Sequence, residues 1–223
     1  MDSSAIQTQS PVSSRKLQLH PVYAIYGMVF SALSTFIASF TIAIVSKTIS
    51  SRRFLISDTF RSDPARAIAS FGLSLTSAFA FVVFFCRYLL GSGSRRENVA
   101  MALAVFACIC MLGVHAFTLT YSRLVHNSSA FGLFISGISA ATLFASEERK
   151  LNDGRLSSGT RMRYFLLSGS VLSLLVMVTG FLWNWAVSSA AEISMALFMF
   201  ACLASYHHEF RTRRVLLAIH LSP

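Results

Sequence analysis

Charge is what this sequence has least of. Only 13% of its 223 residues are Asp, Glu, Lys or Arg, whereas 54% are apolar. This balance excludes a disordered chain and is typical of membrane proteins. The net charge of +10 lies in the segments between the apolar runs rather than on one face of a folded domain, and no nucleic-acid-binding motif accompanies it. We therefore expect no nucleic-acid partner.

Cysteine is also scarce, and its positions exclude a disulfide scaffold. All four cysteines lie inside apolar runs, at Cys86, Cys108, Cys110 and Cys202. Cys108 and Cys110 are two residues apart, so on a helix their side chains diverge by about 200° and cannot share a metal ion. We interpret all four as small packing residues.

The familiar catalytic motifs are missing as well. The sequence contains no H-E-x-x-H, no G-x-S-x-G, no phosphate-binding glycine loop and no paired membrane aspartates. We therefore expect no enzyme, no cofactor and no metal. An intramembrane lipid hydrolase built from His115, His126 and Glu192 is the alternative that stays open, because catalytic groups need not be neighbours in sequence.

Six long apolar stretches account for most of the chain. A helix needs about 20 apolar residues to cross the roughly 30 Å hydrocarbon core of a bilayer, and each stretch is apolar almost all round. The stretches cover residues 22–46, 67–90, 99–121, 128–146, 164–183 and 189–206. They predict an all-α membrane protein, a six-transmembrane-helix bundle over residues 21–210, between a mobile tail (1–20) and a basic tail (211–223).

The distribution of basic residues predicts the orientation. Six spans place both termini on one side of the membrane, and 13 of the 19 Lys and Arg residues flank the spans on that side. Because short basic segments stay cytoplasmic, we expect both tails in the cytosol. There we expect basic side chains to contact lipid head groups, namely Arg95, Arg96, Arg211, Arg213 and Arg214. Arg87 closes the second span and is expected to extend to the head groups in the same way.

Small residues recur every four positions along two spans. The first span carries Gly27, Ser31, Thr35, Ser39 and Ala43, and the fourth carries Gly132, Ser136 and Ala140. Such a stripe lines one helix face and lets two backbones approach closely. It predicts helix contacts within one bundle, and a homo-oligomer through the same stripes is the alternative.

A few ionisable groups lie at membrane depth, where they are costly and often functional. His115, His126, Glu192 and Asp58 are all expected near the outer face, so they predict a lumenal polar cluster. Such a cluster suits a lipid head group, or lumenal acid, since an imidazole with pKa near 6.5 changes charge there. The alternative is that these groups tie loops to helix ends. Asn127 opens a formal glycosylation sequon beside them.

Three short motifs in order along the chain resemble the damage-regulated autophagy modulator (DRAM) family. The first is Ile56-Ser57-Asp58-Thr59, followed by Pro64 and by Arg87-Tyr88 at the end of the second span. The second is Val125-His126 with Ala130-Phe131, and the third is Ser189-Ala190-Ala191-Glu192 with a closing Glu209-Phe210. Ile193 stands where that family usually carries Trp, which leaves the subfamily open. The DRAM family is related to the post-GPI-attachment remodelling proteins.

The resemblance implies a lysosomal or late endosomal protein that promotes autophagy, acting on membrane lipids or partner proteins rather than as an enzyme. Two alternatives stay open. One is a Golgi or ER factor in the lipid remodelling of GPI anchors. The other is a plasma-membrane scaffold that recruits a lipid kinase through its basic cytosolic segments.

Overall fold

A computed structural model describes residues 16–49, 55–60, 63–118, 121–151, 154–212 and 217–220. Its long helices are α1 (Val22–Val45), α2 (Ala65–Leu89), α3 (Arg95–Ala116), α4 (Arg123–Leu151), α5 (Ser158–Trp183) and α6 (Trp185–Ala204). The minor elements are a 3-10 helix η1 (Ile56–Phe60), a short helix α7 (Tyr206–Thr212) and the strands β1 (Lys16–Leu19) and β2 (Leu217–His220).

The prediction of six membrane-spanning helices is confirmed. Six helices in the described ranges are long and apolar enough to cross a membrane, and α7 continues the sixth span after Ser205. The helices are longer than their apolar runs: α4 covers Arg123–Leu151, whereas the run covers 128–146. Its extra turns carry charged residues, and several of these side chains pair with neighbouring helices.

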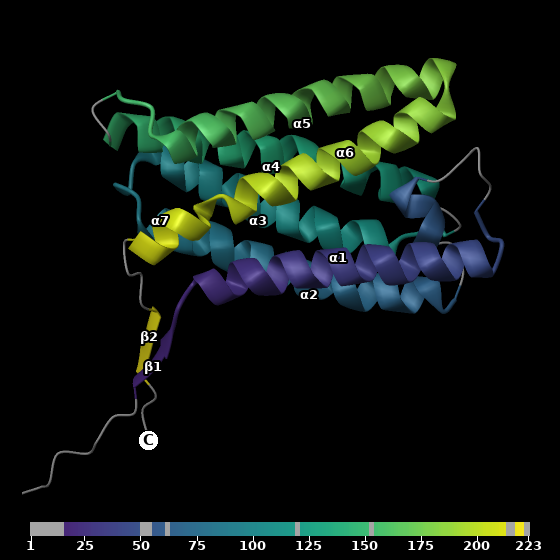
Figure 1. The fold of residues 1–223 in the computed structure, drawn as a ribbon, viewed down its shortest axis with the longest axis horizontal. Helices are drawn as coiled ribbons and strands as arrows, with labels where there is room; N and C mark the ends of the chain where they lie inside the picture. Colours follow the sequence, from purple (N-terminus) through teal and green to yellow (C-terminus); the bar gives the residue numbers. More distant parts are fainter. Residues whose placement is uncertain are drawn as a thin grey trace, which may run out of the picture.

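The helices pack as three neighbouring pairs, α1 with α2, α3 with α4 and α5 with α6 (Figure 1). All run roughly parallel to the long axis of the molecule, so the bundle has two ends. We call the end where α1 begins and α7 lies the terminal end. The opposite end, where η1 lies beside α1, is the η1 end (Figure 1).

The predicted small-residue stripe of α1 packs against α2 within the chain. The hydroxyls of Ser31 and Thr76 share a hydrogen bond of 2.8 Å between the two helices. A Cβ atom added at Gly72 of α2 would overlap the hydroxyl of Thr35, so only glycine fits there. On α4, a Cβ at Gly132 would lie 2.7 Å from Cys110 Sγ of α3. Within the chain these stripes therefore provide close helix contacts, and a homo-oligomer through the same stripes stays a prediction.

The strands β1 and β2 form a small antiparallel sheet beside the terminal end, with Lys16 opposite His220 (Figure 1). The sequence predicted only the mobile tail (1–20) and the basic tail (211–223) here, because strands of four residues with two or three apolar side chains each are too short to stand out. The rest of that tail, residues 1–15, and residues 213–216 and 221–223 lie outside the described residues.

Candidate functional site

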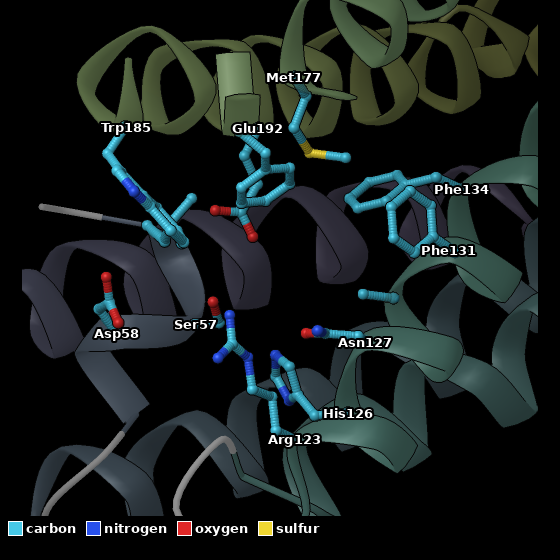
Figure 2. A pocket seen from close by; sticks show the side chains of 13 residues that line it. Ser57, Asp58, Arg123, His126, Asn127, Phe131, Phe134, Met177, Trp185 and Glu192 are labelled. Carbon is cyan, nitrogen blue, oxygen red and sulfur yellow. The ribbon is translucent and has the colours of Figure 1, made fainter. Parts of the chain in front are cut away.

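A pocket of about 570 Å³ opens at the η1 end, and we call it the vestibule. It lies between η1, the first turns of α4, the last turns of α5 and the first turns of α6 (Figure 2). Polar side chains come from Ser57, Asp58, Arg123, His126, Asn127 and Glu192. The apolar wall is formed mainly by Phe131, Phe134, Met177, Phe181 and Trp185. A pocket lined by both charged groups and aromatic rings suits an amphipathic ligand.

His126 is held in a defined orientation by the end of α3. Its Nδ1 lies 2.9 Å from the carbonyl oxygen of Val114 and 2.9 Å from that of Phe117. Both partners are acceptors, so Nδ1 carries the proton and donates. The last carbonyls of a helix have no partner within the helix, and His126 satisfies two of them. Its Nε2 makes no hydrogen bond to the part of the chain that the structure describes, while the side chain lines the vestibule.

Glu192 connects α6 to η1. Its Oε2 accepts a hydrogen bond of 2.9 Å from the backbone N–H of Ile56, the first residue of η1. A carboxylate is favoured at such a position because the first N–H groups of a helix are unpaired. The second oxygen, Oε1, accepts no hydrogen bond from the described residues and is available to a ligand in the vestibule.

Arg123 is a vestibule residue that sequence reasoning had counted only as a topology signal. It is the first residue of α4 and is exposed, and its guanidinium points into the vestibule opposite the carboxylate of Glu192 (Figure 2). Within the described ranges Arg123 forms no hydrogen bond or ion pair. The signal was present in the sequence, since Arg123 precedes His126 by three residues and therefore shares its helix face.

The four residues of the predicted cluster do not all meet. Asp58, His126 and Glu192 line the vestibule together, and Asp58 is only 6% exposed. His115 lies apart: its Nε2 shares a hydrogen bond of 3.1 Å with the hydroxyl of Ser74, between α3 and α2. Asn127, the sequon residue, lies in the first turns of α4 and also lines the vestibule.

A second, narrower cavity continues from the vestibule into the bundle, and we call it the axial pocket. Its volume is about 90 Å³, and its lining is almost entirely apolar. Five residues line both cavities and form what we call the neck, namely Ser57, His126, Ala130, Phe134 and Glu192. Two of the predicted polar residues, His126 and Glu192, therefore stand where the amphipathic vestibule passes into an apolar cavity.

The terminal end holds a second group of charged side chains, which we call the ionic cluster. Its members are buried, with side chains at most 10% exposed, and come from five helices: Arg87, Glu97, Glu148, Arg163 and Glu209. Buried charges are stable only when they are paired and hydrogen-bonded. In contrast to the vestibule groups, these charges meet each other directly.

The prediction that Arg87 extends to the lipid head groups is wrong. Its side chain is 1% exposed and turns into the bundle. There Nη2 donates to the carbonyl oxygen of Phe144 at 3.2 Å, while Glu97 and Glu209 lie within 4.0 Å of the guanidinium. Because carboxylates of the protein balance its charge at this end, Arg87 does not need lipid head groups as counter-ions.

Arg163 has the most partners in the ionic cluster. It forms an ion pair with Glu148 and a second one, of 3.1 Å, with Glu209 of α7. Its Nε donates to the hydroxyl of Ser205 at 3.0 Å, and its guanidinium lies 3.9 Å from the ring centre of Tyr206. Arg163 thus holds the junction of α6 and α7 against α4 and α5.

The basic residues predicted to contact lipid head groups fall at the same end. Arg95, Arg96 and Arg211 are exposed, and Arg96 also lies 3.8 Å from Glu147. Arg213 and Arg214 lie outside the described residues. Among the residues the structure places, no group of three or more His, Cys, Asp or Glu side chains could hold a metal ion.

Fold and site together define a multi-pass helical membrane protein with an amphipathic pocket at one end of its bundle. Residues 21–213 match the family described as the Frag1/DRAM/Sfk1/Cwh43P N-terminal domain, and the chain belongs to this family. The resemblance stated from the sequence motifs is thereby confirmed. No curated protein and no solved structure matches the chain.

The motif residues divide between the two ends of the bundle. Ile56, Ser57, Asp58 and Thr59 form most of η1, and His126 and Glu192 join it at the vestibule. Arg87 belongs to the ionic cluster, and Phe210 is fully buried beside it, stacked on Tyr206. Pro64 precedes α2 at the η1 end.

Proposed function

We propose that this protein is a non-enzymatic endomembrane protein of the DRAM type, which promotes autophagy from a lysosomal or late endosomal membrane by binding membrane lipid in the vestibule. Family membership supports the class of protein. Most basic segments between spans flank the terminal end, so in this proposal the terminal end is cytosolic and the vestibule opens toward the lumen.

The observation that carries the proposal is the composition of the vestibule. Arg123 and Glu192 face its interior from opposite sides, and aromatic side chains form its wall. The pocket lies at the end of the spanning helices, which is the depth at which lipid head groups meet the hydrocarbon core. A lipid meets both requirements with one molecule, because its polar head contacts the charges and its hydrocarbon contacts the rings.

The proposal is tested in cells that lack the protein and receive either the wild-type chain or the double variant Arg123→Gln, Glu192→Gln. We expect the wild type to restore autophagic flux, measured as turnover of a long-lived reporter protein. The double variant should reach the same compartment and restore little flux. His115→Gln is the matched control, because His115 also sits near the η1 end but outside the vestibule.

Full flux with the double variant, expressed and sorted normally, contradicts the proposal. Unchanged flux together with reduced surface levels of GPI-anchored proteins in the deficient cells would move the function to GPI-anchor remodelling. The proposal that the protein is not an enzyme is checked by mass spectrometry of lipid incubated with the purified protein. The lipid should be recovered with its mass unchanged.

A further inference from the structure

We infer that the vestibule and the axial pocket together bind a single-chain lipid whose ammonium group adjoins the hydrocarbon chain and whose phosphate lies outermost. This inference rests on the proposed function and specifies its ligand. A phosphorylated long-chain amine has this order of groups. The axial pocket, the neck and the mouth of the vestibule each match one part of this ligand.

The axial pocket is suited to one hydrocarbon chain. Its lining combines phenylalanine rings, such as Phe84 and Phe200, with small or flexible apolar residues, such as Ala107 and Met199. Its lining on α6 runs from Glu192 to Leu203, a rise of about 16 Å at 1.5 Å per residue. An apolar cavity of about 150 Å³ stays dry and binds a molecule as small as benzene. At about 90 Å³ this cavity has room for a short part of one hydrocarbon chain and none for a second chain.

The neck is suited to an ammonium group. Glu192 stands there with Oε1 free of hydrogen bonds from the described residues, while Oε2 is held by the N–H of Ile56. His126 Nε2 is an acceptor in the neutral ring, because Nδ1 carries the proton. A group that sits between two acceptors at the top of an apolar cavity is best matched by a donor with positive charge. A phosphate at this point would meet the carboxylate of Glu192 and be repelled.

The mouth is suited to a phosphate. Arg123 lines the vestibule but not the axial pocket, so it stands outside the neck. It is exposed, and no described residue pairs with it. A cation and an anion that face one cavity without touching each other fit a ligand that carries both charges. Asp58 also lines the vestibule outside the neck, but its carboxylate lies on the far side of Ser57 from the Arg123 guanidinium (Figure 2). The positions of Glu192 and Arg123 therefore set the order of the ligand's charges, with the ammonium inside and the phosphate outside.

The order of charges is tested with two single-chain amino phospholipids of similar chain length, and Glu192→Gln separates the effect of that order from the effect of the extra negative charge on a phosphate monoester. Sphingosine phosphate has its ammonium beside the chain, whereas lysophosphatidylethanolamine has its phosphate nearer the chain and its ammonium outermost. Binding of each is measured to the full-length protein in detergent micelles by competition with labelled sphingosine phosphate. We expect sphingosine phosphate to bind about tenfold tighter, the effect of one charge-assisted contact.

Substitutions of single residues test each of the three contacts between the protein and the lipid. Glu192→Gln should remove the preference between the two lipids. Arg123→Gln should weaken sphingosine phosphate but leave sphingosine, which lacks the phosphate, unchanged. Ala107→Leu should weaken a full-length chain more than a short one, because Ala107 lines the axial pocket. Ala104→Leu is its matched control, one turn away on α3 and equally buried but outside the cavity.

The outcomes separate this inference from the function on which it rests. Binding of lipid with equal affinity for the two amino phospholipids, or with preference for lysophosphatidylethanolamine, overturns the inference and leaves the proposed function standing. Equal loss of binding in Ala107→Leu and Ala104→Leu removes the axial pocket as the chain site. If Ala107→Leu does not fold, Ala80→Leu on the facing helix replaces it. Absence of any lipid binding to the wild type contradicts both.

Discussion

The two ends of the bundle use charged residues in opposite ways. At the terminal end, the five members of the ionic cluster contact one another and leave only small parts of their side chains exposed. At the η1 end, Arg123 and Glu192 face a cavity of about 570 Å³ and do not contact each other. Charges that pair with each other form a structural joint between helices, whereas charges that are held apart around a cavity form a candidate binding site.

The difference follows from what holds each side chain in place. Arg163 is positioned by side chains from α4, from α7 and from Ser205 between α6 and α7, so its removal affects several helices. His126 and Glu192 are each positioned by backbone groups, the carbonyls of Val114 and Phe117 and the N–H of Ile56. Each side chain has a second polar atom, Nε2 of His126 and Oε1 of Glu192, that is available to a ligand in the vestibule. Changes at the two ends should therefore affect different properties of the protein.

The largest expected effect is the loss of stability in Arg163→Met. The substitution leaves Glu148 and Glu209 buried near the terminal end without their main cation, which costs about 3–5 kcal/mol. We expect a marked fall in the melting temperature of the detergent-solubilised protein. Arg161→Met is the control, since Arg161 lies two residues earlier and is exposed. An equal fall in both variants would contradict the role of the ionic cluster.

Matched carboxylate-to-amide changes compare the two ends directly. Glu148→Gln weakens the ion pair with Arg163 and should cost about 2–3 kcal/mol. Glu192→Gln should cost less than about 1 kcal/mol, because the amide oxygen can still accept from Ile56. The melting temperatures of the two variants measure this order. A larger loss in Glu192→Gln would show that the η1 end is also primarily a structural joint.

The two histidines near the η1 end should differ moderately. His126→Ala removes the donor to the carbonyls of Val114 and Phe117 at the end of α3 and should destabilise the protein by about 1–2 kcal/mol. His115→Ala removes only the contact with Ser74 and should cost less than about 1 kcal/mol. Lipid binding should fall in the first variant alone. Equal loss of lipid binding in both would place His115 in the site after all.

The smallest expected effect on stability is that of Arg123→Gln. Arg123 is exposed and unpaired among the described residues, so its replacement should leave the melting temperature unchanged. It should nevertheless weaken binding of a phosphate-bearing lipid, and the remaining binding should depend less on salt. Arg87→Gln gives the opposite pattern, since Arg87 is buried in the ionic cluster. A destabilised Arg123→Gln would indicate a structural partner for that guanidinium.

Much of this fold could be predicted from the sequence, since continuous apolar runs mark spanning helices without reference to their neighbours. The gathering of Asp58, His126 and Glu192 also followed from topology, because six spans place these residues at one end. The separate position of His115 did not, because it depends on how α3 is rotated. The ionic cluster was equally out of reach: a charged residue at the end of a span either extends to head groups or pairs inside, and only packing decides.

The most direct test of the account is a high-resolution structure of the full-length protein in lipid nanodiscs that contain sphingosine phosphate. We expect elongated density in the axial pocket, passing the neck at Glu192 and ending beside Arg123, with the ionic cluster unchanged at the terminal end. A vestibule closed by a direct ion pair between Arg123 and Glu192, with no lipid density inside, would contradict the central claim that this end is a site rather than a joint.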